Sequence, residues 1–157
     1  MELSKIFTFE ASHILPKHPG KCSRLHGHSW VLEVTVEGSV NPETGFVMDY
    51  ADLKAAVQPV VDRLDHRHLG AWAGGFKGRS VISSWVYNFS EMNTQFGVEF
   101  MSLDFYPSSE NLITWIGTQI DDQVGKKFWS KLKLNETCTS SCTLTREEYE
   151  RTAGNER

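Results

Sequence analysis

Apolar and polar residues alternate along two runs near the start of the chain, and this pattern predicts two β-strands with one buried face each. The first run, Leu3–His13, places Phe7, Phe9, Ala11 and His13 on one face. The face of the second run consists of His26, His28, Trp30, Leu32, Val34 and Val36. Both apolar faces therefore end in histidine, and the Pro- and Gly-rich stretch between the runs is expected to form a loop.

Helical spacing replaces alternation in two later segments. The first predicted helix opens at Asp49 or Ala51 and runs to about Leu64, and Pro59 should kink it or remove one hydrogen bond. The second helix is expected to begin after an N-cap at Ser108. The apolar stripes are Leu53, Val57, Val60, Val61 and Leu64 in the first helix and Leu112, Ile113, Ile116 and Ile120 in the second.

Shorter strands are predicted elsewhere. Phe46–Met48 is expected to return as a short strand, and the last strand is expected over Lys131–Thr137. Two alternating runs, near residues 81–89 and 98–105, favour an extra hairpin in the segment that is hardest to interpret. The succession of strands and helices predicts an α+β fold in which an antiparallel sheet carries two helices on one face.

Length, charge and cysteine content narrow the class of protein. The 157 residues are enough for a single domain over residues 1–157, with an insertion at about 70–105. A net charge of −4 argues against a general nucleic-acid binder, because such proteins usually carry a basic surface. No apolar run has the length of a membrane span, and no signal-peptide pattern opens the chain. Cys22, Cys138 and Cys142 cannot all pair within one chain, so reduced thiols and a cytoplasmic location are expected.

Three histidines indicate a metal site. Gly27 separates His26 from His28, so both rings point to one face of a strand, as does His13 on the preceding strand. Three imidazoles without a fourth protein ligand are typical of an open, catalytic zinc site. Any one of these histidines alone would more often be a satisfied core residue, but three on matching faces favour a metal. His68 is expected at the surface and is given no role.

Four further residues carry possible chemistry, each with an ordinary alternative. Glu136 ends an apolar strand face and is either a ligand for adjacent N–H groups, as in a pterin or guanine, or a carboxylate that faces water. Cys22 is either a small buried thiol or a thiolate that serves as a general base. Asp65 and His66, at the predicted end of the first helix, either reflect the helix dipole or form a proton relay.

Five motifs occur in a fixed order. They are Phe9-Glu-Ala-Ser-His13, Cys22-Ser-Arg-Leu-His26-Gly-His28, Gly45-Phe-Val-Met-Asp49, Leu64-Asp-His66 and Asn135-Glu-Thr-Cys138. Together they resemble the 6-pyruvoyl-tetrahydropterin synthase family. The ending Glu136-Thr-Cys-Thr-Ser-Ser-Cys142 is especially similar to the bacterial branch of that family, the 6-carboxy-5,6,7,8-tetrahydropterin synthases of the queuosine pathway. The resemblance covers most of the chain apart from the middle segment and the C-terminal tail.

The resemblance implies a tunnelling fold, in which the sheets of a trimer-based homo-oligomer join into a barrel with active sites at subunit interfaces. It implies zinc on His13, His26 and His28, Cys22 as proton acceptor, Asp65 and His66 as a catalytic relay, and Glu136 as the catalytic residue that anchors the pterin ring. It also implies that Ser109 and Glu110 complete the substrate pocket, from a neighbouring subunit.

The implied reaction converts 7,8-dihydroneopterin triphosphate into 6-carboxy-5,6,7,8-tetrahydropterin, with release of acetaldehyde and triphosphate. Two alternatives remain open: a 6-pyruvoyl-tetrahydropterin synthase, and a non-catalytic subunit that binds pterin or zinc. The chain departs from the family pattern at Gly70, where asparagine is usual, at Tyr106-Pro-Ser108, which replaces Asn-Pro-Thr, and in its long insertion. The ligand and catalytic positions are all retained.

Overall fold

The computed structural model of the chain describes residues 1–71, 97–125 and 127–154. The strands are β1 (Glu2–His13), β2 (His26–Glu37), β3 (Arg67–Ala71), β4 (Phe100–Leu103), β5 (Lys131–Asn135) and β6 (Ser141–Thr145). The α-helices are α1 (Tyr50–Asp62), α3 (Ser109–Val124) and α4 (Arg146–Gly154), and η1 (Lys21–Ser23) is a 3-10 turn. Among the described helices, none combines the length and apolar character needed to cross a membrane.

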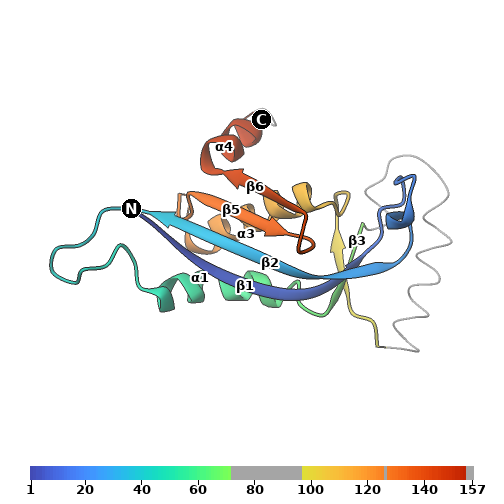
Figure 1. Ribbon diagram of the computed structural model, residues 1–157, viewed down its shortest axis with the longest axis horizontal. Coiled ribbons are helices and arrows are strands. Elements are labelled where there is room, and N and C mark those ends of the chain that lie inside the picture. The colour runs from blue at the N-terminus through green and yellow to red at the C-terminus, as the bar shows by residue number, and fades with distance from the viewer. Residues whose placement is uncertain (72–96, 126, 155–157) are drawn as a thin grey trace.

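The hairpin of β1 and β2 forms the centre of the sheet, whose strand order is β4-β3-β1-β2-β5-β6 (Figure 1). These two strands pair antiparallel along their whole length, from Glu2 opposite Glu37 to His13 opposite His26. β5 and β6 continue the antiparallel pairing on one side. On the other side β3 runs parallel to β1 and β4 runs parallel to β3, which makes the sheet mixed. The α+β class predicted from the sequence is confirmed.

One face of the hairpin is buried against the helices, as the alternation predicts. Trp30, Leu32 and Val34 are fully buried, and they pack in one core with the apolar stripes of α1 and α3. The predicted N-cap Ser108 accepts a hydrogen bond from the backbone of α3, and Asp49, one of the two predicted starts of the first helix, accepts one from the backbone of α1. The sequence pattern therefore predicted the central hairpin, the two long helices and the side of the sheet that they cover.

Pro59 removes one hydrogen bond from α1, and a neighbouring helix compensates for the loss. Because proline has no backbone N–H, the carbonyl of Ala55, four residues earlier, has no helical donor at that position. The side-chain amide of Gln123 on α3 donates to this carbonyl at 3.5 Å. The proline thus lies inside the helix, as predicted, and the free carbonyl becomes a point of contact between α1 and α3.

Several shorter elements differ from the sequence-based expectation. Phe46–Met48 is not a strand, because the carbonyl of Phe46 closes a local turn by accepting from the backbone N–H of Asn41 at 2.8 Å. The last predicted strand ends at Asn135, and β6 and α4 were not predicted. Of the two alternating runs, the one near 98–105 contains β4, which pairs parallel with β3, and the one near 81–89 lies outside the described residues.

A buried ion pair fixes α4 and the start of β5 against α3. The Arg146 guanidinium donates to both carboxylate oxygens of Asp121, at 2.6 and 2.8 Å, and to the carbonyl of Trp129 at 3.0 Å. It also stacks on the Trp129 ring, 3.7 Å from the ring centroid. Gly117 allows this ring to approach α3, because a Cβ at position 117 would lie 2.7 Å from the Trp129 side chain. The C-terminal part of the described chain is therefore held by a single cluster of close contacts.

Candidate metal centre and active site

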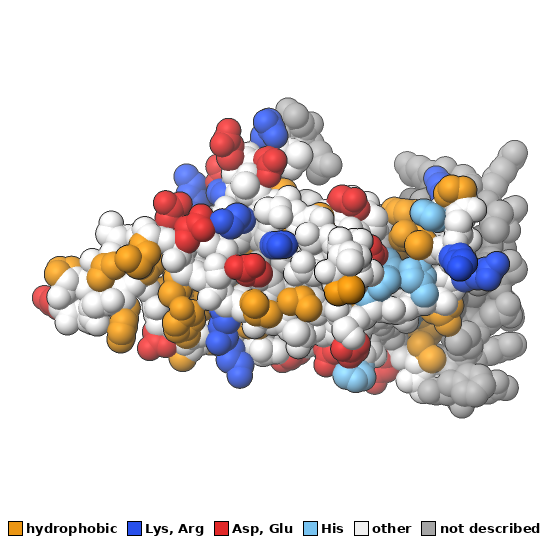
Figure 2. Space-filling view, in the orientation of Figure 1, with side chains coloured by type: hydrophobic (Ala, Val, Ile, Leu, Met, Phe, Trp, Pro, Cys, Tyr) orange, Lys and Arg blue, Asp and Glu red, His pale blue; other side chains and the backbone are white. Residues whose placement is uncertain are grey.

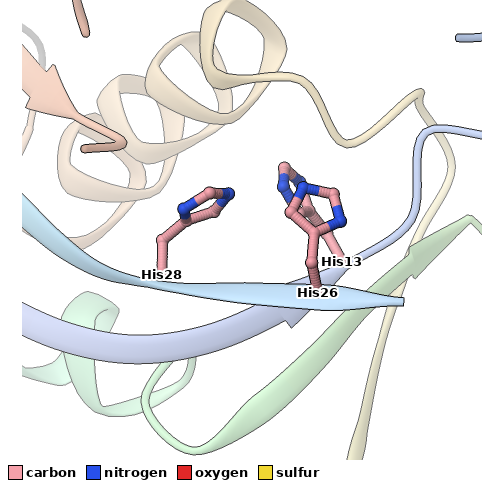
Figure 3. Close-up of side chains that lie close together, drawn as sticks. All are labelled: His13, His26 and His28. Atoms are coloured by element: carbon pink, nitrogen blue, oxygen red, sulfur yellow. The ribbon is translucent and has the colours of Figure 1, made fainter. Parts of the chain in front are cut away.

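The pairing of β1 with β2 brings three histidines together at one end of the sheet. His13 lies opposite His26, and Ala11 lies opposite His28, so the three imidazoles project from neighbouring strands toward one another (Figure 3). Their ring centroids are 4.5 to 5.1 Å apart. One ring nitrogen from each residue lies within 4.8 Å of the other two, a spacing suited to one metal ion.

Backbone carbonyls fix the orientation of two of these rings. Nδ1 of His13 lies 2.8 Å from the carbonyl of Pro107, and Nδ1 of His26 lies 2.8 Å from the carbonyl of Arg24. A carbonyl only accepts hydrogen bonds, so each Nδ1 carries the proton and each Nε2 keeps a free lone pair. Nε2 of His13 and Nε2 of His28 are buried, and neither has a hydrogen-bond partner among the residues that the structure describes. Buried, unpartnered lone pairs that converge are the donor set that a metal ion would satisfy.

Burial favours the neutral form of two of these histidines, His13 and His28. Desolvation lowers the pKa of His13 to about 4. The pKa of His28 is also lowered, mainly by desolvation and to a smaller extent by the electrostatic effect of the neighbouring His26. The Glu136 carboxylate opposes this shift at His28. Neutral imidazole is the form that binds metals, so the lowered pKa values of His13 and His28 favour metal binding.

Trp30 and Glu136 form the floor and one wall of the histidine site. The Trp30 ring lies edge-on to His13 and His28, at centroid distances of 5.4 and 5.3 Å, and its indole N–H donates to the Ala11 carbonyl. Glu136 follows β5 directly, and its Oε1 lies 3.4 Å from Nε2 of His13 and 3.7 Å from Nε2 of His28. The convergence of Glu136 with the histidines, inferred from strand parity, is present in the structure. The orienting role of the Pro107 carbonyl was not foreseen.

Cys22 lies in η1, in the loop that joins the two histidine-bearing strands. Its carbonyl accepts a hydrogen bond from the backbone N–H of Leu15 at 2.9 Å, which ties the turn to the end of β1. The residue is half-buried, and its thiol is not part of a disulfide. The thiol therefore lies in the loop between His13 and His26. This placement is compatible with both alternatives for Cys22, a packed thiol and a general base.

Asp65 and His66 form a hydrogen-bonded pair in the turn after α1, not at the helix end where the sequence placed them. Nδ1 of His66 lies 2.9 Å from a carboxylate oxygen of Asp65. The other carboxylate oxygen accepts from the backbone N–H of Glu10 at 2.8 Å, and the backbone of His66 bonds to the Glu10 carbonyl. These contacts, first the Glu10 N–H and then His66, lower the pKa of Asp65. The pair is therefore anchored along β1, and the His66 side chain is 77% exposed.

Ser109 and Glu110, in the first turn of α3, both interact with Cys142 of the same chain. The pKa of the Cys142 thiol, in β6, is raised mainly by burial, and the charges of Glu110 and Glu136 raise it further. A hydrogen bond with Ser109 acts in the opposite direction. The family resemblance implies that Ser109 and Glu110 complete the pocket of a neighbouring subunit. Within this chain, the thiol of Cys142 interacts with Ser109, Glu110 and Glu136.

His68 is buried, although its sequence context suggested a surface position. Only 4% of its side chain is exposed, and Nδ1 lies 2.9 Å from the hydroxyl of Ser12 on β1. Burial lowers the pKa of His68 to about 4, below the value of 6.5 for the unfolded chain. No sequence pattern indicates this burial, because β3 is short and its burial depends on the strands beside it.

Replacing His68 with glutamine should flatten the acid limb of the stability profile. Unfolding at pH 5 adds a proton to His68, so the native state loses up to about 3 kcal/mol as the pH falls from 6.5 to 4. Urea denaturation of His68→Gln at several pH values should therefore show a smaller loss over this interval than the unmodified protein. The matched control is His18→Gln, an exposed loop substitution that should leave the slope unchanged. Equal slopes in all three proteins would contradict the prediction.

Comparisons with known proteins agree with this architecture. The family model described as 6-pyruvoyl tetrahydropterin synthase matches residues 2–147. The 6-carboxy-5,6,7,8-tetrahydropterin synthase of Synechocystis is 34% identical over 87% of this chain and 87% of its own length. The protein of that name from Haemophilus influenzae is 30% identical over 90% of this chain and 96% of its own length.

The fold is also similar to that of a solved structure with the same family name. The structure of the Caenorhabditis elegans 6-pyruvoyl tetrahydropterin synthase superposes with a TM-score of 0.65, at 21% identity, over 92% of this chain and 94% of that one. This likeness identifies the tunnelling fold. With the family model covering nearly the whole described chain, and with the histidine cluster at the end of its central hairpin, the chain belongs to the 6-pyruvoyl tetrahydropterin synthase family.

Proposed function

We propose that this protein is a zinc-dependent lyase. It would convert 7,8-dihydroneopterin triphosphate and water into 6-carboxy-5,6,7,8-tetrahydropterin, acetaldehyde and triphosphate. The observation that carries the proposal is the convergence of the His13, His26 and His28 ring nitrogens within 4.8 Å, with the Glu136 carboxylate beside two of them. The names of the Synechocystis and Haemophilus influenzae relatives support the choice of this reaction within the family.

Zinc is the metal proposed for the three histidines. Neutral imidazole suits zinc, and three protein ligands leave a coordination position open for a substrate. The buried, unpartnered nitrogens of His13 and His28 fit such an ion. When bound, zinc would act as a Lewis acid that makes the hydroxyl groups of the substrate side chain more acidic.

Glu136 is proposed to hold the pterin ring. A carboxylate accepts two parallel hydrogen bonds from an amino group and an adjacent ring N–H, which a pterin presents side by side. Glu136 is 24% exposed at its side chain, so it is partly open to a ligand. Ser109 and Glu110 would complete this wall, since they share with Glu136 the surroundings of Cys142. The ring would then lie between the start of α3 and the turn after β5.

Cys22 is proposed as the base that removes a proton from the substrate side chain, and Asp65 with His66 as the relay that exchanges a second proton. The Asp65 carboxylate would orient the imidazole by accepting a hydrogen bond from Nδ1 of His66. Because this pair is anchored at Glu10 and exposed, it is proposed to serve a site at the interface with another copy of the chain. A trimer-based, cytoplasmic homo-oligomer is part of the same proposal.

A product assay tests the proposed reaction. The zinc-loaded protein, incubated with 7,8-dihydroneopterin triphosphate, should release acetaldehyde and triphosphate in equal amounts, measured by an alcohol dehydrogenase coupled assay and by ion chromatography. Triphosphate with a 6-pyruvoyl pterin and no acetaldehyde would instead identify the other synthase of the family. No turnover by protein that holds one zinc ion per chain would favour a non-catalytic pterin-binding subunit. Protein stripped of metal by a chelator and then reloaded is the control.

A further inference from the structure

Positive charge gathers in the loop that joins the two histidine-bearing strands. The chain as a whole has a net charge of −4, yet residues 14–25, here called the basic loop, contain Lys17, Lys21 and Arg24 and no Asp or Glu. On the face shown in Figure 2, Lys and Arg side chains lie next to the histidine cluster. The local charge is therefore opposite in sign to that of the whole protein, at the edge of the candidate metal site.

The basic loop and Glu136 contact different histidines of the cluster. Glu136 contacts the Nε2 atoms of His13 and His28, whereas His26 is bound through its Nδ1 to the carbonyl of Arg24. A ligand whose ring lies at Glu136 and whose side chain crosses the histidines would direct the end of that side chain toward the basic loop. In dihydroneopterin triphosphate, that end carries the phosphates.

Lys21 and Arg24 are held in place by the backbone of the loop while their side chains stay in solvent. The N–H of Arg24 bonds to the carbonyl of Lys21 at 3.0 Å across η1, and the hydroxyl of Ser23 bonds to the Gly20 carbonyl at 2.8 Å. Both cationic side chains are exposed. In the part of the chain that the structure describes, no carboxylate forms an ion pair with either of them. Two anchored cations thus remain available for an anionic ligand.

We propose that Lys21 and Arg24 bind the phosphate tail of the substrate and make the site prefer phosphorylated pterins. This inference rests on the proposed function and identifies the part of the site that would bind the phosphate groups. Arg24 can donate two parallel hydrogen bonds to a phosphate group, and Lys21 supplies a compact positive charge. The same charges would stabilise the triphosphate as it leaves, since negative charge develops on the departing oxygen.

The test compares two fluorescent, oxidised pterins, neopterin and neopterin triphosphate, as ligands of the zinc-loaded protein. The unmodified protein should bind the triphosphate more tightly than neopterin. Lys21→Gln and Arg24→Gln should each weaken triphosphate binding by about tenfold, because a hydrogen bond to a charged group is lost. Their affinity for neopterin should not change. The matched control is Lys54→Gln, an exposed lysine in the first turns of α1, at the other end of the molecule (Figure 1).

Each other outcome overturns a defined claim. If both pterins bind but Lys21→Gln and Arg24→Gln leave the ratio of the two affinities unchanged, the phosphate role of the basic loop is wrong and the proposed function stands. An equal loss for both pterins would mean that the substitutions only disturb the loop, and would also overturn the inference. If the unmodified protein binds neither pterin, the proposed function fails and this inference fails with it. Zinc content is measured in every variant, because free triphosphate chelates metal ions.

Discussion

Cys22→Ala is expected to keep one zinc ion per chain and to lower turnover of dihydroneopterin triphosphate by about 100- to 10,000-fold, the contribution typical of a positioned general base. The metal should remain because the three histidines form the donor set without the thiol. The side chain is small and only half-buried, so its removal should leave the loop folded. Turnover is measured by acetaldehyde release, and zinc content by atomic spectroscopy on the same samples.

His28→Ala is the matched comparison for this result. It removes one of the buried nitrogens that converge on the site, so zinc content and turnover should fall together. Loss of zinc from Cys22→Ala would make Cys22 a metal ligand, and unchanged turnover would remove its proposed role as base. The two variants therefore separate metal binding from proton transfer, which a measurement of activity alone cannot do.

Asp121→Asn is expected to lower the free energy of unfolding by about 3 kcal/mol, the cost of leaving one partner of a buried ion pair uncompensated. The Asp121 carboxylate is 8% exposed, and it accepts two hydrogen bonds from the Arg146 guanidinium, which is 15% exposed. The asparagine has nearly the same volume, so the effect reports the lost charge and not a cavity. Urea denaturation at pH 7 measures the change.

An exposed ion pair provides the control for Asp121→Asn. Glu2 and Lys131 join neighbouring parts of the sheet at 2.8 Å, but both side chains are open to water. Glu2→Gln should therefore leave the denaturation midpoint nearly unchanged, since exposed pairs contribute little to stability. If the free energy of unfolding fell equally in the two variants, burial would not be the reason why the Asp121–Arg146 pair contributes to stability.

Much of the central architecture could be predicted because it depends on local pattern. Alternation identified β1 and β2, and their shared parity placed His13, His26 and His28 on one face before any pairing was known. Ser108 was predicted as the N-cap of the second helix, and the first helix was predicted to open at Asp49 or Ala51; both Ser108 and Asp49 are N-caps in the structure. The position of Glu136 followed from the parity of β5. In each case the residues that determine the structure lie within a few positions of one another.

The remainder depends on contacts between segments that are distant in sequence. β3 has five residues and pairs parallel with β1, so neither a hairpin turn nor a long apolar run in the sequence predicts it. The burial of His68 follows from that pairing. Asp65 and His66 were assigned to a helix end because the apolar stripe continues to Leu64. In the structure α1 ends at Asp62, and the following turn is hydrogen-bonded to the backbone of Glu10. The Pro107 carbonyl that orients His13 is 94 residues away in sequence.

Gly117 links the packing of the C-terminal cluster around Trp129 to the helix that carries two residues of the proposed substrate site. It lies on α3, about 12 Å along the helix axis from Ser109. A methyl group at position 117 would lie 2.7 Å from the Trp129 ring, so either the ring or the helix would have to move. Movement of the helix would carry Ser109 and Glu110 with it. The absence of a side chain at Gly117 thus allows α3 to pack closely on Trp129, and this packing contributes to the position of Ser109 and Glu110 in the proposed substrate site.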